Sequence, residues 1–212
     1  MVIVTIIAAY LLGSFPTSYL VGKILRGIDI RKFGSGNVGA TNMFRVLGPA
    51  PGILVLLVDI AKGVICVSLV APYVASHFDT SLGLGWLKIL AGISVIAGHN
   101  WSIFLRFKGG KGVATSAGVL LGISPEALGL AAIVWLVVTG ASKYVSLGSI
   151  VSAISLPIFM WLSGEDKATV FFAIAIAILV VVRHRANIIR LIHHKENKIC
   201  LGRGAGWADT GR

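Results

Sequence analysis

The stretch PGILVLLVDIAKGVICVSLVAPYVA, residues 51–75, decides the fold class of this chain. Asp59 and Lys62 are its only charged residues, and apolar side chains fill most of the other positions. The hydrocarbon core of a bilayer is about 30 Å thick, so a helix rising about 1.5 Å per residue needs roughly 20 residues to cross it. This run is therefore long enough to cross a membrane as a single helix.

Other parts of the chain repeat this pattern. Apolar runs of similar character occupy residues 1–22, 87–105, 145–162 and 168–182. Pro16 predicts a kink in the first run. The stretch 113–141 is too long for one span and too short for two full ones, and Ser124-Pro125-Glu126 interrupts it. It is either one kinked helix or a pair of short helices.

The distribution of charge favours the pair of helices, because cytoplasmic loops of membrane proteins carry an excess of Lys and Arg. If residues 113–141 cross twice, the basic loops and the basic tail from Arg183 share one side of the membrane. A single crossing would put that tail outside and the acidic pair Glu165 and Asp166 inside. We therefore expect an all-α, polytopic integral membrane protein with seven transmembrane helices, the fourth and fifth short, its N-terminus outside and its C-terminus cytoplasmic. A re-entrant pair, with six or fewer spans, is the alternative.

Composition supports one membrane domain, residues 1–192, followed by a basic cytoplasmic tail, residues 193–212. Of 212 residues, 56% are hydrophobic and only 13% are charged, too few to cover a soluble domain of this length. The net charge is +11, but the basic residues stand between the apolar runs and form no long tract, which argues against nucleic acid as a partner. Cys66 and Cys200 belong to no CxxC or metal-ligand pattern, so we expect no disulfide and no metal site. We also expect no cofactor.

The first of three polar clusters is the glycine-rich segment at residues 34–42. Its three glycines permit positive φ angles, and successive N–H groups of such a loop form an anion-binding concavity. Arg45 follows and can bind phosphate through its planar guanidinium. The alternative is a simple turn in which Thr41 or Asn42 caps the next helix. Polar residues at almost every non-glycine position favour ligand binding.

The second cluster combines residues 98–100 with residues 108–115. A Gly-Gly-Lys-Gly run leading into an apolar helix presents N–H groups and the positive end of the helix dipole to an anion, and Lys111 adds a charge. The GxxxxGK[ST] spacing of a nucleotide-binding loop is absent. Alternatively, Lys108 and Lys111 only set the topology, and His99 is a hydrogen-bonded residue at a helix end.

The third cluster, residues 183–191, ends the last apolar run. His184, Asn187 and Arg190 are spaced three apart, which predicts that they share one helical face suited to a phosphorylated substrate. A basic amphipathic end lying on anionic lipid is the alternative, and it explains Asn187 poorly. Ser149 begins the sixth helix on the same side and is expected to face inward.

Asp59 and Lys62 are the only pair of opposite charges inside an apolar run. Three residues apart, they can neutralise each other on one helix face. We interpret them as a structural pair, with direct substrate contact as the alternative.

The clusters, in this order, resemble the bacterial acyl-phosphate:glycerol-3-phosphate acyltransferase family (PlsY). The matching segments are GSGNVGATNMFRVLG at 34–48, DIAKG at 59–63, GHNWSIFLRFKGGKGVATSAG at 98–118, KYVSLGS at 143–149 and RHRANIIRL at 183–191. The likeness to the family extends to about Leu191 and does not include the tail.

The resemblance implies a seven-helix membrane enzyme that moves a fatty acyl group from acyl phosphate to the 1-hydroxyl of sn-glycerol 3-phosphate, without direct use of acyl-CoA or acyl carrier protein. The residues expected to be catalytic are Ser35, Arg45, Lys111, His184 and Asn187. The residues expected to bind substrate are Gly34, Gly36, Asn37, Gly39, Thr41, Asn42, His99, Lys108, Gly109, Gly110, Gly112 and Ser149. The expected partners are these two substrates and the lipid bilayer of a bacterial plasma membrane.

A small membrane transporter of a phosphorylated or anionic solute is the main alternative function. Transporters place charges and broken helices near the bilayer midplane. Here almost every candidate residue is expected at the cytoplasmic ends of helices, which favours the enzyme.

Overall fold

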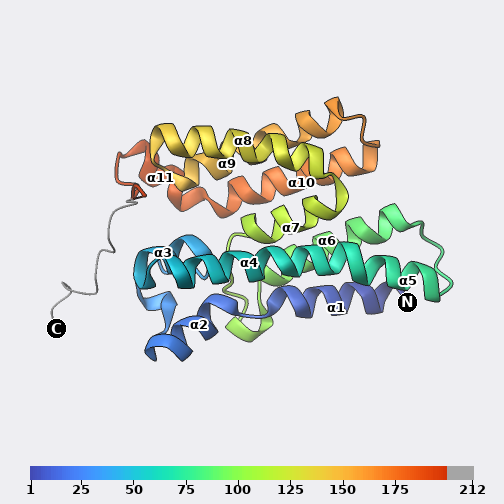
Figure 1. Ribbon diagram of the computed structural model, residues 1–212, viewed down its shortest axis with the longest axis horizontal. Helices are drawn as coiled ribbons and strands as arrows, with labels where there is room; N and C mark the ends of the chain where they lie inside the picture. The colour runs from blue at the N-terminus through green and yellow to red at the C-terminus, as the bar shows by residue number, and fades with distance from the viewer. Residues whose placement is uncertain (200–212) are drawn as a thin grey trace. The chain divides into compact units, whose positions relative to one another are not determined.

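The computed structural model describes residues 1–199, and all regular secondary structure within this range is helical (Figure 1). In chain order the α-helices are α1 (Val2–Ser14), α2 (Thr17–Arg26), α3 (Ala40–Leu47), α4 (Pro49–Ile65), α5 (Ala71–His77), α6 (Leu84–Asn100), α7 (Val113–Ile123), α8 (Pro125–Ser142), α9 (Val145–Leu162), α10 (Lys167–Arg183) and α11 (Arg185–Ile192). A π-helical segment, Cys66–Val70, joins α4 to α5, and the short 3-10 helices are Ile30–Lys32 and Ile103–Leu105. Cys200 and most of the predicted tail lie outside the described residues.

Several helices are long and apolar enough to cross a membrane. The five straightforward candidates are Val2–Arg26, Pro49–His77, Leu84–Leu105, Pro125–Ser142 and Val145–Leu162, and α10 with α11 forms a sixth that bends by 58°. Large apolar side chains such as Ile3, Leu69 and Trp161 are 71%, 62% and 70% exposed. Surfaces of this kind are suited to lipid. The chain is a multi-pass membrane protein, as predicted.

The two predicted interruptions of apolar runs are confirmed. α1 ends at Ser14 and α2 begins after Pro16, because proline has no N–H to continue the helix. α7 ends at Ile123 and α8 begins at Pro125, a first helical position where the missing N–H costs nothing.

The prediction that the fourth and fifth helices are both short is wrong for α8. α7 has 11 residues, about 16 Å, whereas α8 has 18 residues, about 27 Å. The physical reason is that α8 starts directly at Pro125 and no further proline occurs before Lys143, which ends it in the left-handed conformation at φ 63°.

The described residues form two compact units, residues 1–119 and residues 120–199. In the first unit, α1 and α6 pack backbone against backbone. A Cβ on Gly13 would meet the backbone of Val95, and one on Gly98 would meet the carbonyl oxygen of Tyr10. Small residues allow such close approach of membrane helices. The Tyr10 hydroxyl also donates to the carbonyl of Trp101 at 2.7 Å, so the end of α6 is fixed beside α1.

In the second unit, α9 packs against both α8 and α10. Its buried face includes Ile150, Leu156 and Met160. At the start of α10, the Asp166 carboxylate caps the helix by accepting from the backbone N–H groups of Ala168 and Thr169. This framework supports the polar residues at the start of α9 and the end of α10.

Candidate active site

The first polar cluster folds as a loop, residues 33–39, that is held from inside by Asn42. Asn42 is 1% exposed, and its Oδ1 accepts a hydrogen bond from the Ser35 N–H at 2.8 Å. Its Nδ2 donates to the Phe33 carbonyl at 3.1 Å. Gly34 and Gly36 have φ angles of 59° and 70°, which favour glycine. Asn42 is thus a clamp for the loop, and its amide is engaged with the backbone.

The alternative in which a side chain caps the following helix is not what the structure shows. α3 begins at Ala40, and its N-cap is Gly39, which has no side chain to offer. Thr41 and Arg45 lie four residues apart on α3 and therefore project from one face of that helix. Ser35 is exposed. The loop thus runs directly into the N-terminus of α3, which is the positive end of the helix dipole. The polar side chains of Ser35 and Thr41 lie on either side of this helix start in the sequence.

An apolar anchor fixes this loop to the rest of the first unit. Val38, an apolar residue of the loop, is 6% exposed and joins a buried cluster with Met43 of α3 and Val55 of α4. Leu105, from the turn after α6, belongs to the same cluster. The core therefore connects the first polar cluster with the segment that leads into the second.

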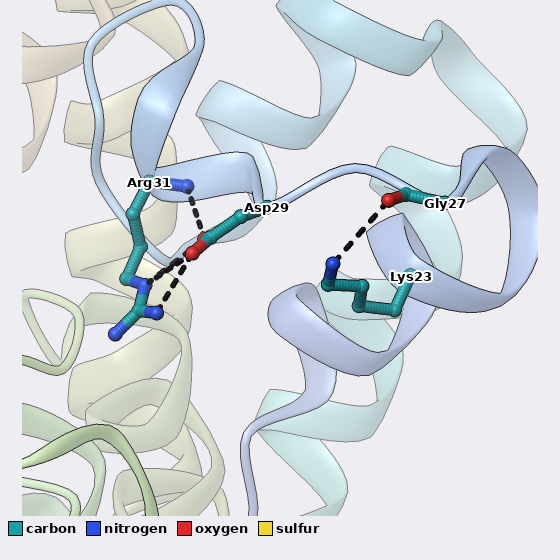
Figure 2. Close-up of polar contacts among 4 residues, drawn as sticks. All are labelled: Lys23, Gly27, Asp29 and Arg31. Atoms are coloured by element: carbon teal, nitrogen blue, oxygen red, sulfur yellow. Dashed lines mark hydrogen bonds and ion pairs between the residues drawn. The ribbon is translucent and has the colours of Figure 1, made fainter.

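The connection from α2 to the loop is stabilised by local polar contacts (Figure 2). The Asp29 carboxylate accepts from the Arg31 guanidinium at 2.9 Å and 2.7 Å and from the Arg31 N–H at 3.1 Å. These hydrogen bonds lower the pKa of Asp29 to about 2. Lys23 donates to the carbonyl of Gly27, where α2 ends in the left-handed conformation. The chain thus enters the loop on a fixed path.

The second polar cluster folds back onto the end of α6. The N–H of Gly109 donates to the Asn100 carbonyl at 3.2 Å, and the N–H of Gly110 donates to the His99 carbonyl at 3.0 Å. A Cβ on Gly110 would meet Nε2 of His99. Glycine is therefore required for the imidazole to lie directly on the loop. As predicted, the glycine run leads into a helix, α7, which starts at Val113.

Within this cluster the two lysines differ in exposure. Lys108 is exposed, whereas Lys111 is partly buried. Gly112 has a φ of 79° and lies against the fully buried side-chain amide of Asn100. Asn100 therefore joins His99 in packing against the glycine loop.

The first and second clusters meet in the first unit at a small cavity. Its volume is about 10 Å³, room for about one water molecule. Residues from the helix break, from α4, from α6 and from both polar clusters line it, among them Ser14, Val38, Asp59, Lys62, His99 and Gly110. Asp59 and Lys62 form a buried ion pair of 2.8 Å, so the predicted pair exists.

The third cluster lies in the second unit and is bent where a straight helix was predicted. His184 both ends α10 and precedes α11, and the two helices meet at 58°. Asn187 and Arg190 lie on α11, whereas His184 stands at the bend before it, so the three residues do not lie on one straight helix. His184 is 3% exposed and donates Nδ1–H to the Val180 carbonyl at 2.8 Å. In the neutral imidazole this tautomer makes Nε2 an acceptor.

A carboxylate that sequence reasoning missed, Glu196, connects this cluster. Its Oε1 accepts from Asn187 Nδ2 at 2.7 Å and from the Ser146 hydroxyl at 2.9 Å, and its Oε2 accepts from Arg190 Nε at 2.7 Å. Burial raises the pKa of Glu196, but these three hydrogen bonds together lower it below its ordinary value. Glu196 is one of two acidic residues in the predicted tail, with Asp209, and an acidic residue in a basic tail was the one available signal. The beginning of that tail is thus folded.

Ser149 faces inward, as expected, and is 4% exposed. Its hydroxyl donates to the Val145 carbonyl at 2.9 Å and accepts from the Trp135 indole at 3.2 Å. Trp135 of α8 was not singled out in the sequence, because nothing local to it indicates a partner on α9.

Chemically, the first unit offers two glycine-rich loops with Arg45 and Lys111, which suit phosphate. The second unit offers an imidazole, an amide and a guanidinium. Within residues 1–199, no group of three or more His, Cys, Asp or Glu side chains could hold a metal ion.

The comparisons with known proteins agree with this chemistry. The family described as Glycerol-3-phosphate acyltransferase matches residues 3–194. The glycerol-3-phosphate acyltransferase of Desulforudis audaxviator is 45% identical over 197 residues, which are 93% of this chain and 95% of the relative. Glycerol-3-phosphate acyltransferase 2 of Moorella thermoacetica is 48% identical over 197 residues, 93% of this chain and 97% of the relative.

Two crystal structures of PlsY, described as an integral membrane glycerol 3-phosphate acyltransferase, share the fold at 38% sequence identity. The match to the glycerol 3-phosphate form has a TM-score of 0.84 and covers 94% of this chain and 96% of the chain in that structure. The match to the lysophosphatidic acid form has a TM-score of 0.82 and covers 94% of this chain and 95% of the chain in that structure. The resemblance seen in the sequence is thereby confirmed. Because the family match and relatives of 45% and 48% identity extend over nearly the whole chain, the protein belongs to the glycerol-3-phosphate acyltransferase family and is an acyltransferase.

Proposed function

We propose that this protein transfers a fatty acyl group from acyl phosphate to the 1-hydroxyl of sn-glycerol 3-phosphate, the first acylation of phospholipid synthesis. The products are 1-acylglycerol 3-phosphate and inorganic phosphate. The observation that carries the proposal is the pair of glycine-rich loops in the first unit, which meet at one small cavity. Two phosphate-bearing substrates need two such sites.

The acceptor and the product are supported by the similar solved structures, one of them in a glycerol 3-phosphate form and the other in a lysophosphatidic acid form. The donor is argued from chemistry. An acyl phosphate is already activated, so the protein need not supply a covalent nucleophile. The sequence accordingly has no GxSxG segment and no HxxxxD segment. The family assignment leaves the transporter alternative without support.

We assign the donor to the first loop, and the acceptor to Arg45, to Ser149 and to residues of the second and third clusters. The N–H groups of residues 37–39 and the Ser35 hydroxyl bind the phosphate of the donor and stabilise the charge that develops as it leaves. Arg45 and Lys111 bind the phosphate of the acceptor. Ser149, His184 and Asn187 orient its glycerol portion.

In the reaction, the 1-hydroxyl oxygen attacks the acyl carbonyl carbon, and the bond between that carbon and the phosphate oxygen breaks. The hydroxyl proton passes to an oxygen of the departing phosphate, which lies beside the carbonyl throughout. His184 accepts a hydrogen bond from the hydroxyl through Nε2 and sets its direction of attack. This route needs no protein base and no acyl-enzyme.

We further propose seven membrane crossings, with the N-terminus outside, the C-terminus in the cytoplasm and the active site at the cytoplasmic face of a bacterial plasma membrane. α7 would be the short seventh crossing. The supporting observation is the charge of the loops, since an even number of crossings between residues 113 and 142 keeps the basic segments on one side.

The proposed function is tested with purified protein, glycerol 3-phosphate and three donors: palmitoyl phosphate, palmitoyl-CoA and palmitoyl-acyl carrier protein. We expect lysophosphatidic acid and inorganic phosphate in equal amounts, only with palmitoyl phosphate, and dependent on glycerol 3-phosphate. Direct use of either thioester in the absence of acyl phosphate would contradict the assignment of the donor.

A further inference from the structure

The Asp59–Lys62 pair lies inside an apolar membrane helix, α4, where charge is costly. Both residues are almost completely buried, at 2% and 3% exposed. Taking two charges out of water costs more than their attraction returns unless further hydrogen bonds are made. The other contacts of the pair therefore indicate its role.

The first set of contacts holds the break between α1 and α2. Lys62 Nζ donates to the Phe15 carbonyl at 2.6 Å as well as to Asp59. The Thr17 hydroxyl donates to Asp59 Oδ1 at 3.3 Å. Because Pro16 interrupts the helix, the Phe15 carbonyl has lost its regular helical partner, and it accepts from the Thr17 N–H at 3.0 Å and from Lys62 instead. The pair therefore joins the helix break to α4 and is itself fixed in position.

The second set of contacts leads to the glycine loop. His99 Nδ1 lies 3.7 Å from Asp59 Oδ1, an ion-pair distance if the imidazole is protonated. The other edge of the same ring, Nε2, lies directly against Gly110, where no side chain intervenes. The N–H of Gly110 is bonded to the His99 carbonyl. The imidazole is thus packed between Asp59 on one side and the loop backbone on the other.

We propose that Asp59 and Lys62 are positioning residues for the second glycine loop, acting through His99. Asp59 fixes the imidazole, the imidazole fixes Gly110, and the position of Gly110 sets where Lys111, the next residue, meets the phosphate of glycerol 3-phosphate. This inference rests on the proposed role of that loop. A displacement of about 1 Å of the loop relative to the phosphate is enough to weaken binding substantially.

The competing explanation is that the pair only stabilises the fold. Neutralising only Asp59 or only Lys62 cannot distinguish the two explanations, because it leaves the other charge buried and unpaired. The double variant Asp59→Asn/Lys62→Met removes both charges with little change in volume. We expect it to remain folded in detergent, with the dissociation constant for glycerol 3-phosphate raised about tenfold or more by calorimetry. The KM for glycerol 3-phosphate should rise equally, while the KM for the acyl donor and kcat change by less than about threefold.

The coupling through His99 is tested by a double-mutant cycle. His99→Gln alone should weaken glycerol 3-phosphate binding, and adding Asp59→Asn/Lys62→Met to it should weaken binding by no more than about a further twofold. Full additivity of the two losses would overturn the proposal, and so would unchanged binding in the folded double variant. Asp166→Asn, the same chemical change at the exposed end of α10, serves as the control and should leave binding unchanged.

A further variant keeps the test decisive if the double variant does not fold. Thr17→Val retains both charges and removes only the hydroxyl that steadies Asp59. We expect about a threefold to tenfold loss of glycerol 3-phosphate affinity, and no loss would overturn the proposal. Binding is measured without any acyl donor, so failure of acyl phosphate as a substrate leaves this test intact. A wild-type protein that does not bind glycerol 3-phosphate would instead remove the proposed function and the positioning role together.

Discussion

The side-chain amide of Asn187 donates from Nδ2 to Oε1 of Glu196 at 2.7 Å, so a residue beyond the last helix fixes the orientation of a candidate catalytic amide. With Nδ2 directed at the carboxylate, the carbonyl oxygen of the amide points the other way and can act only as an acceptor. Arg190 and Ser146 donate to the same carboxylate, so the three side chains are held as one group.

The first prediction follows from this group. Glu196→Gln replaces one acceptor oxygen by an NH₂ group, which must face either Arg190 or the pair Asn187 and Ser146, all of them donors. We expect at least a tenfold loss of kcat/KM and a lower midpoint of thermal unfolding in detergent, because a buried partner is left unsatisfied. Glu126→Gln, an exposed carboxylate at the start of α8, should change neither quantity. Full activity of Glu196→Gln would show that the group has no role in orienting Asn187.

The second prediction concerns acid stability. The hydrogen bonds from Arg31 lower the pKa of Asp29 from 3.8 to about 2. Because the folded-state pKa is depressed, the stabilising contribution of Asp29 is complete above about pH 4 and is lost as the pH falls towards about 2. Asp29→Asn should therefore lower the unfolding midpoint by about 2–4 °C at neutral pH. The difference from the wild type should shrink between about pH 4 and pH 2 in a series of thermal melts. A difference independent of pH would contradict the assignment.

The third prediction concerns the two basic residues assigned to the acceptor. Arg45→Ala and Lys111→Ala should each raise the KM for glycerol 3-phosphate about ten- to a hundredfold, as expected for the loss of a charged hydrogen bond worth about 1.5–3 kcal/mol. The KM for acyl phosphate should change much less. Steady-state kinetics with each substrate varied in turn measures the difference, and equal effects on both would mean that these residues only maintain the fold or the topology.

Much of this arrangement could be predicted from the sequence, for reasons that are local. Pro16 and Pro125 lack an N–H, and each stands beside a polar residue that marks a turn, so both breaks were predictable. Glycines at 34, 36 and 112 with positive φ follow from residue type. The bend at His184 and the role of Glu196 depend on contacts between separate segments of the chain, which the hydrophobic periodicity of the local sequence cannot predict. The clamp by Asn42 was missed for the same reason, since its partners lie 7 to 12 residues away.

The fourth prediction concerns the proposed topology. Single cysteines in place of Ser35, Lys108 and Ala186 should resist a membrane-impermeant thiol reagent in intact cells and react after lysis. A cysteine in place of Asp79, in the loop between α5 and α6, should react in intact cells. Each variant also carries Cys200→Ser, and the native Cys66 is fully buried and should not contribute to labelling. Labelling at position 186 from outside would overturn the arrangement with seven crossings.

The fifth prediction separates the two possible roles of His184. Its Nδ1–H is engaged with the Val180 carbonyl, so the neutral ring has the acceptor Nε2 that either a base or an orienting group requires. A base must also hold the proton in the transition state. Arg183 and Arg185 flank His184 in the sequence, and their positive charges oppose a protonated imidazole. A phosphate oxygen of the donor carries negative charge and already lies beside the carbonyl, so it is the better proton acceptor.

His184→Gln is the test, because glutamine retains hydrogen-bonding groups and cannot act as a base. If His184 binds and orients the acceptor, the KM for glycerol 3-phosphate should rise, and kcat should recover substantially when that substrate is saturating. A loss of kcat of about a hundredfold or more that persists at saturation would identify His184 as the base, since general bases contribute about 10²–10⁴. Rapid quenching with labelled acyl phosphate, followed by mass spectrometry, should find no acyl group on the protein with either variant or wild type. An acyl-enzyme on Ser35 would exclude direct transfer altogether.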